Sequence, residues 1–185
     1  MNSTLQTGTD TLASWLAAED SVRKTLQQGV GPGAARREQL ADKTGLEQMQ
    51  AMLAGELPYP QMAQTLDFLL MDVRAGWALF QGTPGTAHLN PMGTIHGGWF
   101  ASVLDSALGC AVHSLLPAGR AYTTAELSVN LVKALTPKVG RVRAEGHVLH
   151  CGRQLATAEA KLLGPDGTLY AHATTTCLVF ELPQR

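Results

Sequence analysis

The sequence predicts an α+β fold in which one long helix is enclosed by a strongly curled antiparallel sheet. Three observations support this prediction. A nearly continuous apolar stretch has helical character at about residues 98–115, later segments have the two-residue period of strands, and turn signals separate those strands. Because a helix that is hydrophobic almost all round needs cover on every side, a curled sheet is the expected neighbour.

The strands are expected in the C-terminal half. The segments "RVRAEGHVLH", "LATAEAKLL" and "LYAHATTTCLVF" alternate between apolar and polar residues, and "AELSVNLVKAL" is rich in β-branched and apolar residues. Gly152 and the sequence "GPDG" at 164–167 are hairpin-type turn signals. The C-terminal half is therefore predicted to be an antiparallel meander, and the segment at about 67–90 one long strand or a hairpin.

The first third of the chain is expected to be helical. Residues 10–55 carry apolar residues at helical spacing, with a break at "GVGPG". Thr44 and Glu47 form the pattern of a capping box, and Gly55 is placed to end the helix that follows. We therefore divide the chain into a helical N-terminal extension, 1–58, and an α+β domain, 59–185.

Composition excludes several classes of protein. Fourteen Lys and Arg residues balance fifteen Asp and Glu residues without a basic run, which argues against a nucleic acid partner. The three cysteines form no CxxC pair, so neither a disulfide framework nor a zinc knuckle is indicated. His147 and His150 lie three apart on a predicted strand, hence on opposite faces, which disfavours a shared metal. No cofactor and no metal site are expected.

The expected location is the cytoplasm. The first twenty residues lack the basic start and apolar core of a signal peptide, and the three separated cysteines suit a reducing compartment. The stretch 99–116 is apolar, but it holds Asp105, which costs about 2.5–3.5 kcal/mol at the centre of a membrane span. We therefore interpret the stretch as a core helix and expect no membrane contact.

Asp105 is the single formally charged residue between Asn90 and Leu116. On a helix, its same-face neighbours are mostly small, so the carboxylate is expected to be reachable; they are Ala101, Ser102, Leu108 and Gly109. A buried charge must be partnered, protonated or open to a cleft. A general base or nucleophile and a hydrogen-bonded core acid are both consistent with this pattern.

The sequence "GTIHGG" before the helix supplies a second half of a site. Backbone N–H groups at a helix start stabilise an oxygen that gains negative charge, and Gly97 and Gly98 allow a substrate carbonyl to approach closely. His96 can take part in this site or simply cap the loop. Gly97 and Asp105 are separated by ~12 Å of helical rise. Either the helix start has a different geometry, or the two halves come from different subunits.

The stretch "NPMGTIHGGWFASVLDSALG" resembles the signature of hotdog-fold acyl-CoA thioesterases of the phenylacetate-degradation (PaaI-like) type. The similarity continues through "YTTAELSVNLVKALTP" and later strands, and it covers about residues 60–182. The resemblance implies a hotdog fold, a homodimer or homotetramer, an acyl-CoA substrate, and active sites at the dimer interface.

The resemblance also implies a role for each matching residue. Asp105 corresponds to the carboxylate that activates water or attacks the thioester, and the Gly97 N–H to the donor that binds the thioester oxygen. His96 shapes the loop, and Asn90 orients the water. A hydroxyl that assists across the interface aligns best at Thr124.

Substrate-binding positions are Gly98, Thr123, which is the fallback for the hydroxyl, and Arg153. Arg153, ahead of Lys133, Arg141 and Arg143, is the first candidate to meet the phosphates of coenzyme A. The expected function is hydrolysis of an acyl- or aryl-CoA thioester. A non-catalytic acyl-CoA-binding module and a hotdog enoyl-CoA hydratase using His96 are the alternatives.

Overall fold

The computed structural model describes residues 8–182. Its elements, in chain order, are helices α1 (Gly8–Gln28), α2 (Arg37–Leu40), α3 (Gly45–Leu53) and α4 (Met62–Leu66), strands β1 (Phe68–Arg74) and β2 (Trp77–Gly82), helix α5 (Gly97–His113), and strands β3 (Arg120–Leu131), β4 (Val142–Cys151), β5 (Leu155–Leu163) and β6 (Leu169–Glu181). Short 3₁₀ turns occupy Thr86–His88 and Pro137–Val139.

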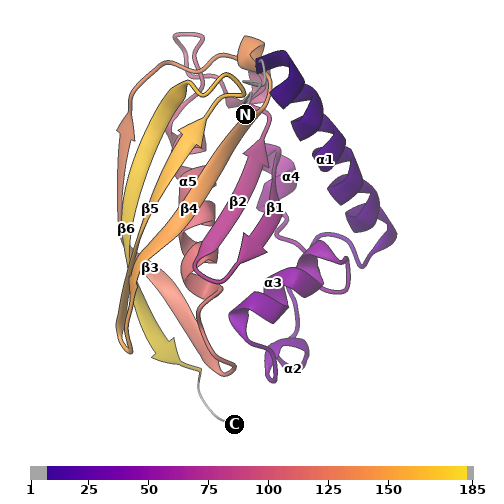
Figure 1. Cartoon of the computed structure of the whole chain (residues 1–185), viewed down its shortest axis with the longest axis vertical. Coiled ribbons are helices and arrows are strands. Elements are labelled where there is room, and N and C mark those ends of the chain that lie inside the picture. Colours follow the sequence, from indigo (N-terminus) through magenta and orange to yellow (C-terminus); the bar gives the residue numbers. More distant parts are fainter. Residues whose placement is uncertain (1–7, 183–185) are drawn as a thin grey trace, which may run out of the picture.

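The six strands form one antiparallel sheet in the order β1-β2-β4-β5-β6-β3. The sheet curves around α5, which lies against its concave face (Figure 1). The prediction of a central helix within a curled antiparallel sheet is therefore confirmed. The predicted meander holds for β4, β5 and β6, but β3 pairs with β6 and lies at the far edge of the sheet. The segment at about 67–90 is a hairpin that ends at Gly82.

Close packing joins α5 to the sheet. Most of α5 is buried, and the face that carries Ser102, Asp105 and Ser106 is half-buried. The buried residues are Trp99, Phe100, Val103, Leu104, Ala107, Leu108, Gly109, Ala111 and Val112. A Cβ on Gly146 of β4 would overlap the backbone of Ala107 and Leu108, so glycine is required where β4 crosses the helix. This contact fixes the depth of α5 in the sheet and hence the position of Asp105.

The N-terminal helices are packed onto the same core. The Thr44 hydroxyl accepts from the Glu47 N–H, and the Glu47 carboxylate accepts from the Thr44 N–H, which confirms the predicted capping box. Gly55, at φ +76, ends this helical segment as expected. Met49 belongs to the hydrophobic cluster around α5. The division at residue 58 stays a prediction, and residues 1–7 of the extension lie outside the described residues.

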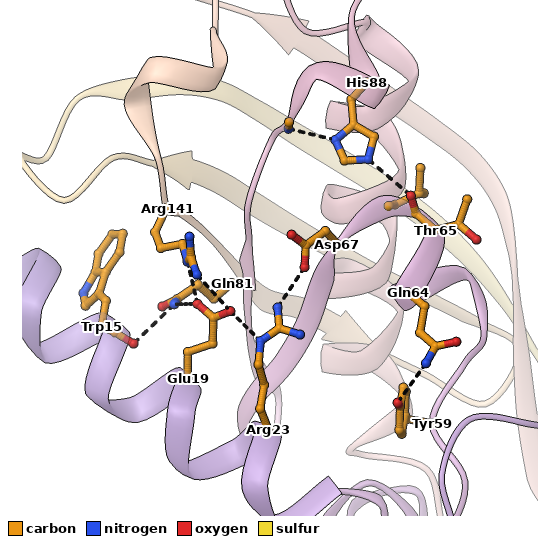
Figure 2. Close-up of polar contacts among 12 residues, drawn as sticks. Trp15, Glu19, Arg23, Tyr59, Gln64, Thr65, Asp67, Gln81, His88 and Arg141 are labelled. Atoms are coloured by element: carbon orange, nitrogen blue, oxygen red, sulfur yellow. Dashed lines mark hydrogen bonds and ion pairs between the residues drawn. The ribbon is translucent and has the colours of Figure 1, made fainter. Parts of the chain in front are cut away.

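Helix α1 is held on the convex face of the hairpin by a polar cluster around Glu19 (Figure 2). The Glu19 carboxylate accepts from Arg141 Nε at 2.6 Å, from Gln81 Nε2 at 2.8 Å and from Arg23 Nε at 2.7 Å. Arg23 also bonds Asp67 at 2.8 Å. These contacts join α1 to β2, to the segment before β4 and to the end of α4. No helix among residues 8–182 is long and apolar enough to cross a membrane.

Candidate active site

The start of α5 is a turn organised by His96. His96 has extended backbone angles, and its Nδ1 accepts from the Gly98 N–H at 2.9 Å. The His96 ring therefore caps the helix, one of the two roles left open by the sequence. Because Gly97 is the first helical residue, its N–H has no acceptor within the helix. A backbone donor thus points outward at the positive end of the helix dipole.

The loop before α5 is ordered by its own polar contacts. Asn90 Oδ1 accepts from the N–H groups of Met92 and Thr94, and Asn90 Nδ2 donates to the Thr94 hydroxyl at 2.9 Å. Within one chain, the Asn90 side chain therefore shapes the loop, and its implied part in orienting water stays a prediction.

His88 is a further residue at this helix start that the sequence did not single out. Its Nδ1 accepts from the Gly85 N–H, and its Nε2 lies 3.2 Å from the Thr65 carbonyl (Figure 2). The His88 carbonyl accepts from the His96 N–H. The position of the His96 turn thus depends on a histidine from a 3₁₀ turn. A single His between Ala and Leu carries no sequence signal for such a role.

Asp105 has a partner on the edge strand. Its Oδ1 accepts from the Thr124 hydroxyl at 2.9 Å, and the carboxylate lines an apolar cavity of about 210 Å³. The carboxylate is thus both hydrogen-bonded and open to a cleft. Both residues belong to one chain, whereas the resemblance implied a hydroxyl from across an interface. Thr123, the fallback, is exposed on the same strand.

The groups around Asp105 are neutral. Burial, together with the negative charge of Asp105, raises the pKa of the Cys110 thiol to about 12. Burial also raises the pKa of Tyr122, and the nearby Cys110 and Asp105 raise it further. At neutral pH the thiol and the phenol are therefore protonated, so neither Cys110 nor Tyr122 is a nucleophile. Among the residues that the structure describes, Asp105 is the only charged side chain on the cavity wall.

One chain does not bring the two halves of the site together. Gly97 and Asp105 are eight residues apart on a regular helix, about 12 Å along its axis. A Cβ on Gly97 would lie 3.4 Å from Leu131, at the end of β3, while Asp105 contacts Thr124 nearer its start. The helix start has ordinary geometry, which removes the first of the two explanations for this distance.

The basic residues that were candidates for phosphate binding differ in their surroundings. Arg153 is exposed in the turn between β4 and β5, and its carbonyl accepts from Arg120. Arg141 binds Glu19, and Arg143 donates to Gln81 at 2.8 Å. Arg141 is thus engaged with α1 and Arg143 with β2, and the suggestion that either meets phosphates stays a prediction.

The prediction that His147 and His150 face opposite sides of the sheet is also wrong. A β-bulge between Val148 and His150 shifts the register, so His147 pairs with Glu159 and His150 with Thr157. Both histidines therefore point to the same exposed face. Within residues 8–182, no group of three His, Cys, Asp or Glu side chains is arranged to hold a metal ion.

A long helix wrapped by a six-stranded antiparallel sheet, with a carboxylate in the helix and a glycine turn at its start, defines a hotdog-fold protein. Residues 92–171 match the family model of the thioesterase superfamily.

Solved structures show the same architecture. A phenylacetic acid degradation-related protein of Ralstonia eutropha, provisionally described as a thioesterase, is 29% identical over 71% of this chain and 98% of its own, with a TM-score of 0.65. The Escherichia coli PaaI protein from the phenylacetic acid degradation operon shares the fold at 18% identity, over 77% of this chain and 99% of its own, with a TM-score of 0.64.

A protein of Halobacterium salinarum whose name assigns it, provisionally, to the esterases is 35% identical over 89 residues. This match covers 48% of the present chain and spans 58% of the length of that relative.

Proposed function

We propose that this chain is an acyl-CoA thioesterase, which hydrolyses the thioester of an acyl- or aryl-CoA to the free acid and CoA. One observation carries the proposal. The Asp105 carboxylate, held by Thr124, is the only charge from residues 8–182 on an apolar cavity beside α5, a helix within the match to the thioesterase superfamily. A carboxylate at the wall of an apolar cavity is suited to act on an uncharged group that binds there.

Asp105 acts in one of two ways. As a general base, it takes a proton from water, whose oxygen attacks the thioester carbon. As a nucleophile, it attacks that carbon itself to give a mixed anhydride, which water then hydrolyses. In both cases the C–S bond breaks and the CoA sulfur leaves as a thiolate that takes a proton. A thioester lacks the resonance stabilisation of an ester, so one carboxylate and a polarised carbonyl suffice.

The Gly97 N–H is proposed to donate to the thioester oxygen as it gains negative charge. The bond from the Gly98 N–H to His96 Nδ1 supports this, because it fixes the turn that presents the Gly97 N–H. Gly98 lets the substrate approach the backbone closely. Asn90 orders the preceding loop, and Arg153 remains the first candidate to meet the CoA phosphates.

The second half of the site is proposed to come from another copy of this chain. Strand β3 is an edge of the sheet, twelve residues long, and most of its side chains are exposed or half-buried. Such an edge is a template for a further strand. Antiparallel pairing of two β3 strands about a two-fold axis near Leu127 would bring the Leu131 end of one alongside the Thr124 region of the other. Gly97 lies beside Leu131, so each pairing would complete two sites.

Thiol release from a panel of acyl- and aryl-CoA thioesters tests the activity. We expect the wild type to release CoA and Asp105→Asn to be slower by about 10²–10⁴-fold, the usual contribution of a positioned acid or base. Asp20→Asn, at an exposed position on α1, is the matched control and should retain wild-type activity. A wild type inactive on the whole panel, or an Asp105→Asn variant as fast as the control, would contradict the proposal.

The two alternatives make different predictions. A binding module would bind acyl-CoA without releasing thiol. A hydratase would change the absorbance of an enoyl-CoA at constant thiol, and it needs a catalytic histidine with an acid beside it. His96 instead uses its Nδ1 to cap α5, which favours hydrolysis over hydration.

A further inference from the structure

We infer that the N-terminal helices form the acyl-binding pocket of this chain and select an elongated, uncharged alkyl group. The inference rests on the proposed thioesterase function and names the substrate class of that same site. It concerns residues 26–63, which precede most of the hotdog domain and lie outside the 92–171 match to the thioesterase superfamily.

The first observation is the composition of the cavity beside Asp105. This cavity, of about 210 Å³, has one wall from α5, β1, β2 and Tyr122. The other wall comes entirely from the N-terminal helices and their connections, through Leu26, Met52, Leu53, Tyr59, Pro60, Met62 and Ala63. An acyl group whose thioester lies at Asp105 therefore has this second wall as its neighbour.

The second observation is a neighbouring cavity. A further cavity of about 340 Å³ lies between α3 and the C-terminal part of α5. The two cavities share four lining residues, which are Met52, Pro60, Cys110 and Tyr122. Met52 thus lies against both spaces, and under this inference a chain that extends past it from Asp105 enters the second cavity.

The chemistry of the lining excludes charged acyl groups. Apart from Asp105, no Asp, Glu, Lys or Arg side chain of residues 8–182 lines either cavity. His113 lines the second cavity, and burial lowers its pKa, so its imidazole is neutral at pH 7. An acyl group that ends in a carboxylate would meet Asp105 at one end and no cation at the other. The cavities therefore suit a hydrocarbon chain.

Size and shape favour a chain over a ring. A dry apolar cavity of about 150 Å³ is enough for benzene, so an aryl group would be accommodated by the first cavity, of about 210 Å³, alone. Only a longer group reaches past Met52 into the second. Methionine is unbranched and flexible, which suits it to a position that must adapt to chains of different length.

The wall is a fixed part of the fold. The Glu19 cluster anchors α1 to the sheet (Figure 2), the capping box begins α3, and the Gly45 N–H donates to the Leu116 carbonyl at 2.9 Å. Tyr59 is held by the Gln64 amide, which donates to its hydroxyl. The N-terminal helices can therefore set a defined pocket length.

The test uses S-alkyl-CoA thioethers, from butyl to dodecyl, which cannot be hydrolysed, with the dissociation constant measured by calorimetry. For the wild type, we expect affinity to rise about fourfold for each additional buried methylene until both cavities are filled. Met52→Phe should end this rise at shorter chains, and Met52→Ala should leave the rise intact. Met71→Ala and Met71→Phe are matched controls on β1, outside both cavities.

The inference would be overturned if affinity depended on chain length in the same way in the wild type and in Met52→Phe. It would also be overturned if a thioether whose alkyl chain ends in a carboxylate bound as tightly as the alkyl thioether of the same length. Thermal unfolding identifies any variant that does not fold. If Met52→Phe does not fold, Met52→Leu replaces it, and its branched side chain, which adapts less than methionine, should also end the rise in affinity at shorter chains. Since binding is measured without turnover, failure of the thioesterase proposal is detected separately by the absence of thiol release.

Discussion

A carboxylate two turns into a buried helix destabilises the fold unless something compensates for its desolvation. In this chain the compensation is the Thr124 hydroxyl, which donates to Asp105 at 2.9 Å, together with the open side toward the cavity. The hydrogen bond fixes one carboxylate oxygen and leaves the other for water or substrate. Thr124 is thus a positioning residue for Asp105.

Replacing Thr124 should weaken catalysis, while the open side of Asp105 toward the cavity limits the loss of stability. We expect Thr124→Val to lower kcat about tenfold or more, because a hydrogen bond to a charged group contributes about 1.5–3 kcal/mol. Thr124→Ser should retain most of the activity. Steady-state thiol release measures both variants, and circular dichroism checks that they fold.

Thr174→Val is the control for the change from threonine to valine, since the side chain of Thr174 is exposed on β6. An equal loss of activity in Thr174→Val and Thr124→Val would show that the hydrogen bond to Asp105 is not the cause.

At the residue scale, the sequence pointed to Asp105 because a lone charge in an apolar helix is visible without coordinates. The pairing with Thr124 in the same chain was not predictable, because it depends on which edge of the sheet β3 occupies. The register of His147 and His150 was missed for a similar reason. A β-bulge adds one residue to a strand and leaves no clear mark in the alternation of apolar and polar residues.

At the scale of elements, α1 is attached through one buried acid, Glu19, and through an apolar contact at Leu26. Burial alone would raise the pKa of Glu19, but hydrogen bonds from Arg141, Arg23 and Gln81 outweigh that effect and lower it. A helix whose side chains are mostly exposed is thereby held by one acid, 3% exposed, on the convex face of the sheet. The sequence did not show this, because Glu19 reads as one more polar residue on a surface helix.

The attachment of α1 should weaken in acid. Because the folded pKa of Glu19 lies below its ordinary value of 4.5, its contribution to stability is fully present above that value and is lost as pH falls through the folded pKa. Near neutral pH, we expect Glu19→Gln to destabilise the fold by about 2–3 kcal/mol. The unfolding midpoint of the wild type should approach that of Glu19→Gln as the pH is lowered beneath 4.5.

Thermal unfolding over a series of pH values measures this, with Glu38→Gln on α2 as the exposed control. A difference between wild type and Glu19→Gln that stays constant on acidification would contradict the assignment.

The elements of the core were predictable to a greater extent than their connections. Strand alternation, turn glycines and the apolar helix gave the correct layers, since each of these patterns reflects local burial. Arg141 and Arg143 are examples of residues whose contacts the local sequence pattern does not predict. Their charge was visible and their exposure was assumed, but their partners Glu19 and Gln81 come from segments 62 or more positions away in the chain.

At the scale of the whole molecule, the two halves of the proposed site lie too far apart on one helix to act on one carbonyl. The exposed edge strand β3 offers a surface on which a second copy would bring them together. Gly97→Pro removes the proposed N–H donor cleanly. Proline is accepted at the first helical position, and His96 at ψ 139 already has the extended conformation that precedes proline.

The measurement that tests this account most directly is complementation between two inactive variants. Asp105→Asn and Gly97→Pro chains, each with a different tag, are co-expressed, and the mixed dimer is purified through both tags. If the site combines Asp105 of one copy with Gly97 of the other, each mixed dimer holds one intact site and shows about half of the wild-type activity. If the mixed dimer is as inactive as the two parent variants, Asp105 and Gly97 do not act together across the interface.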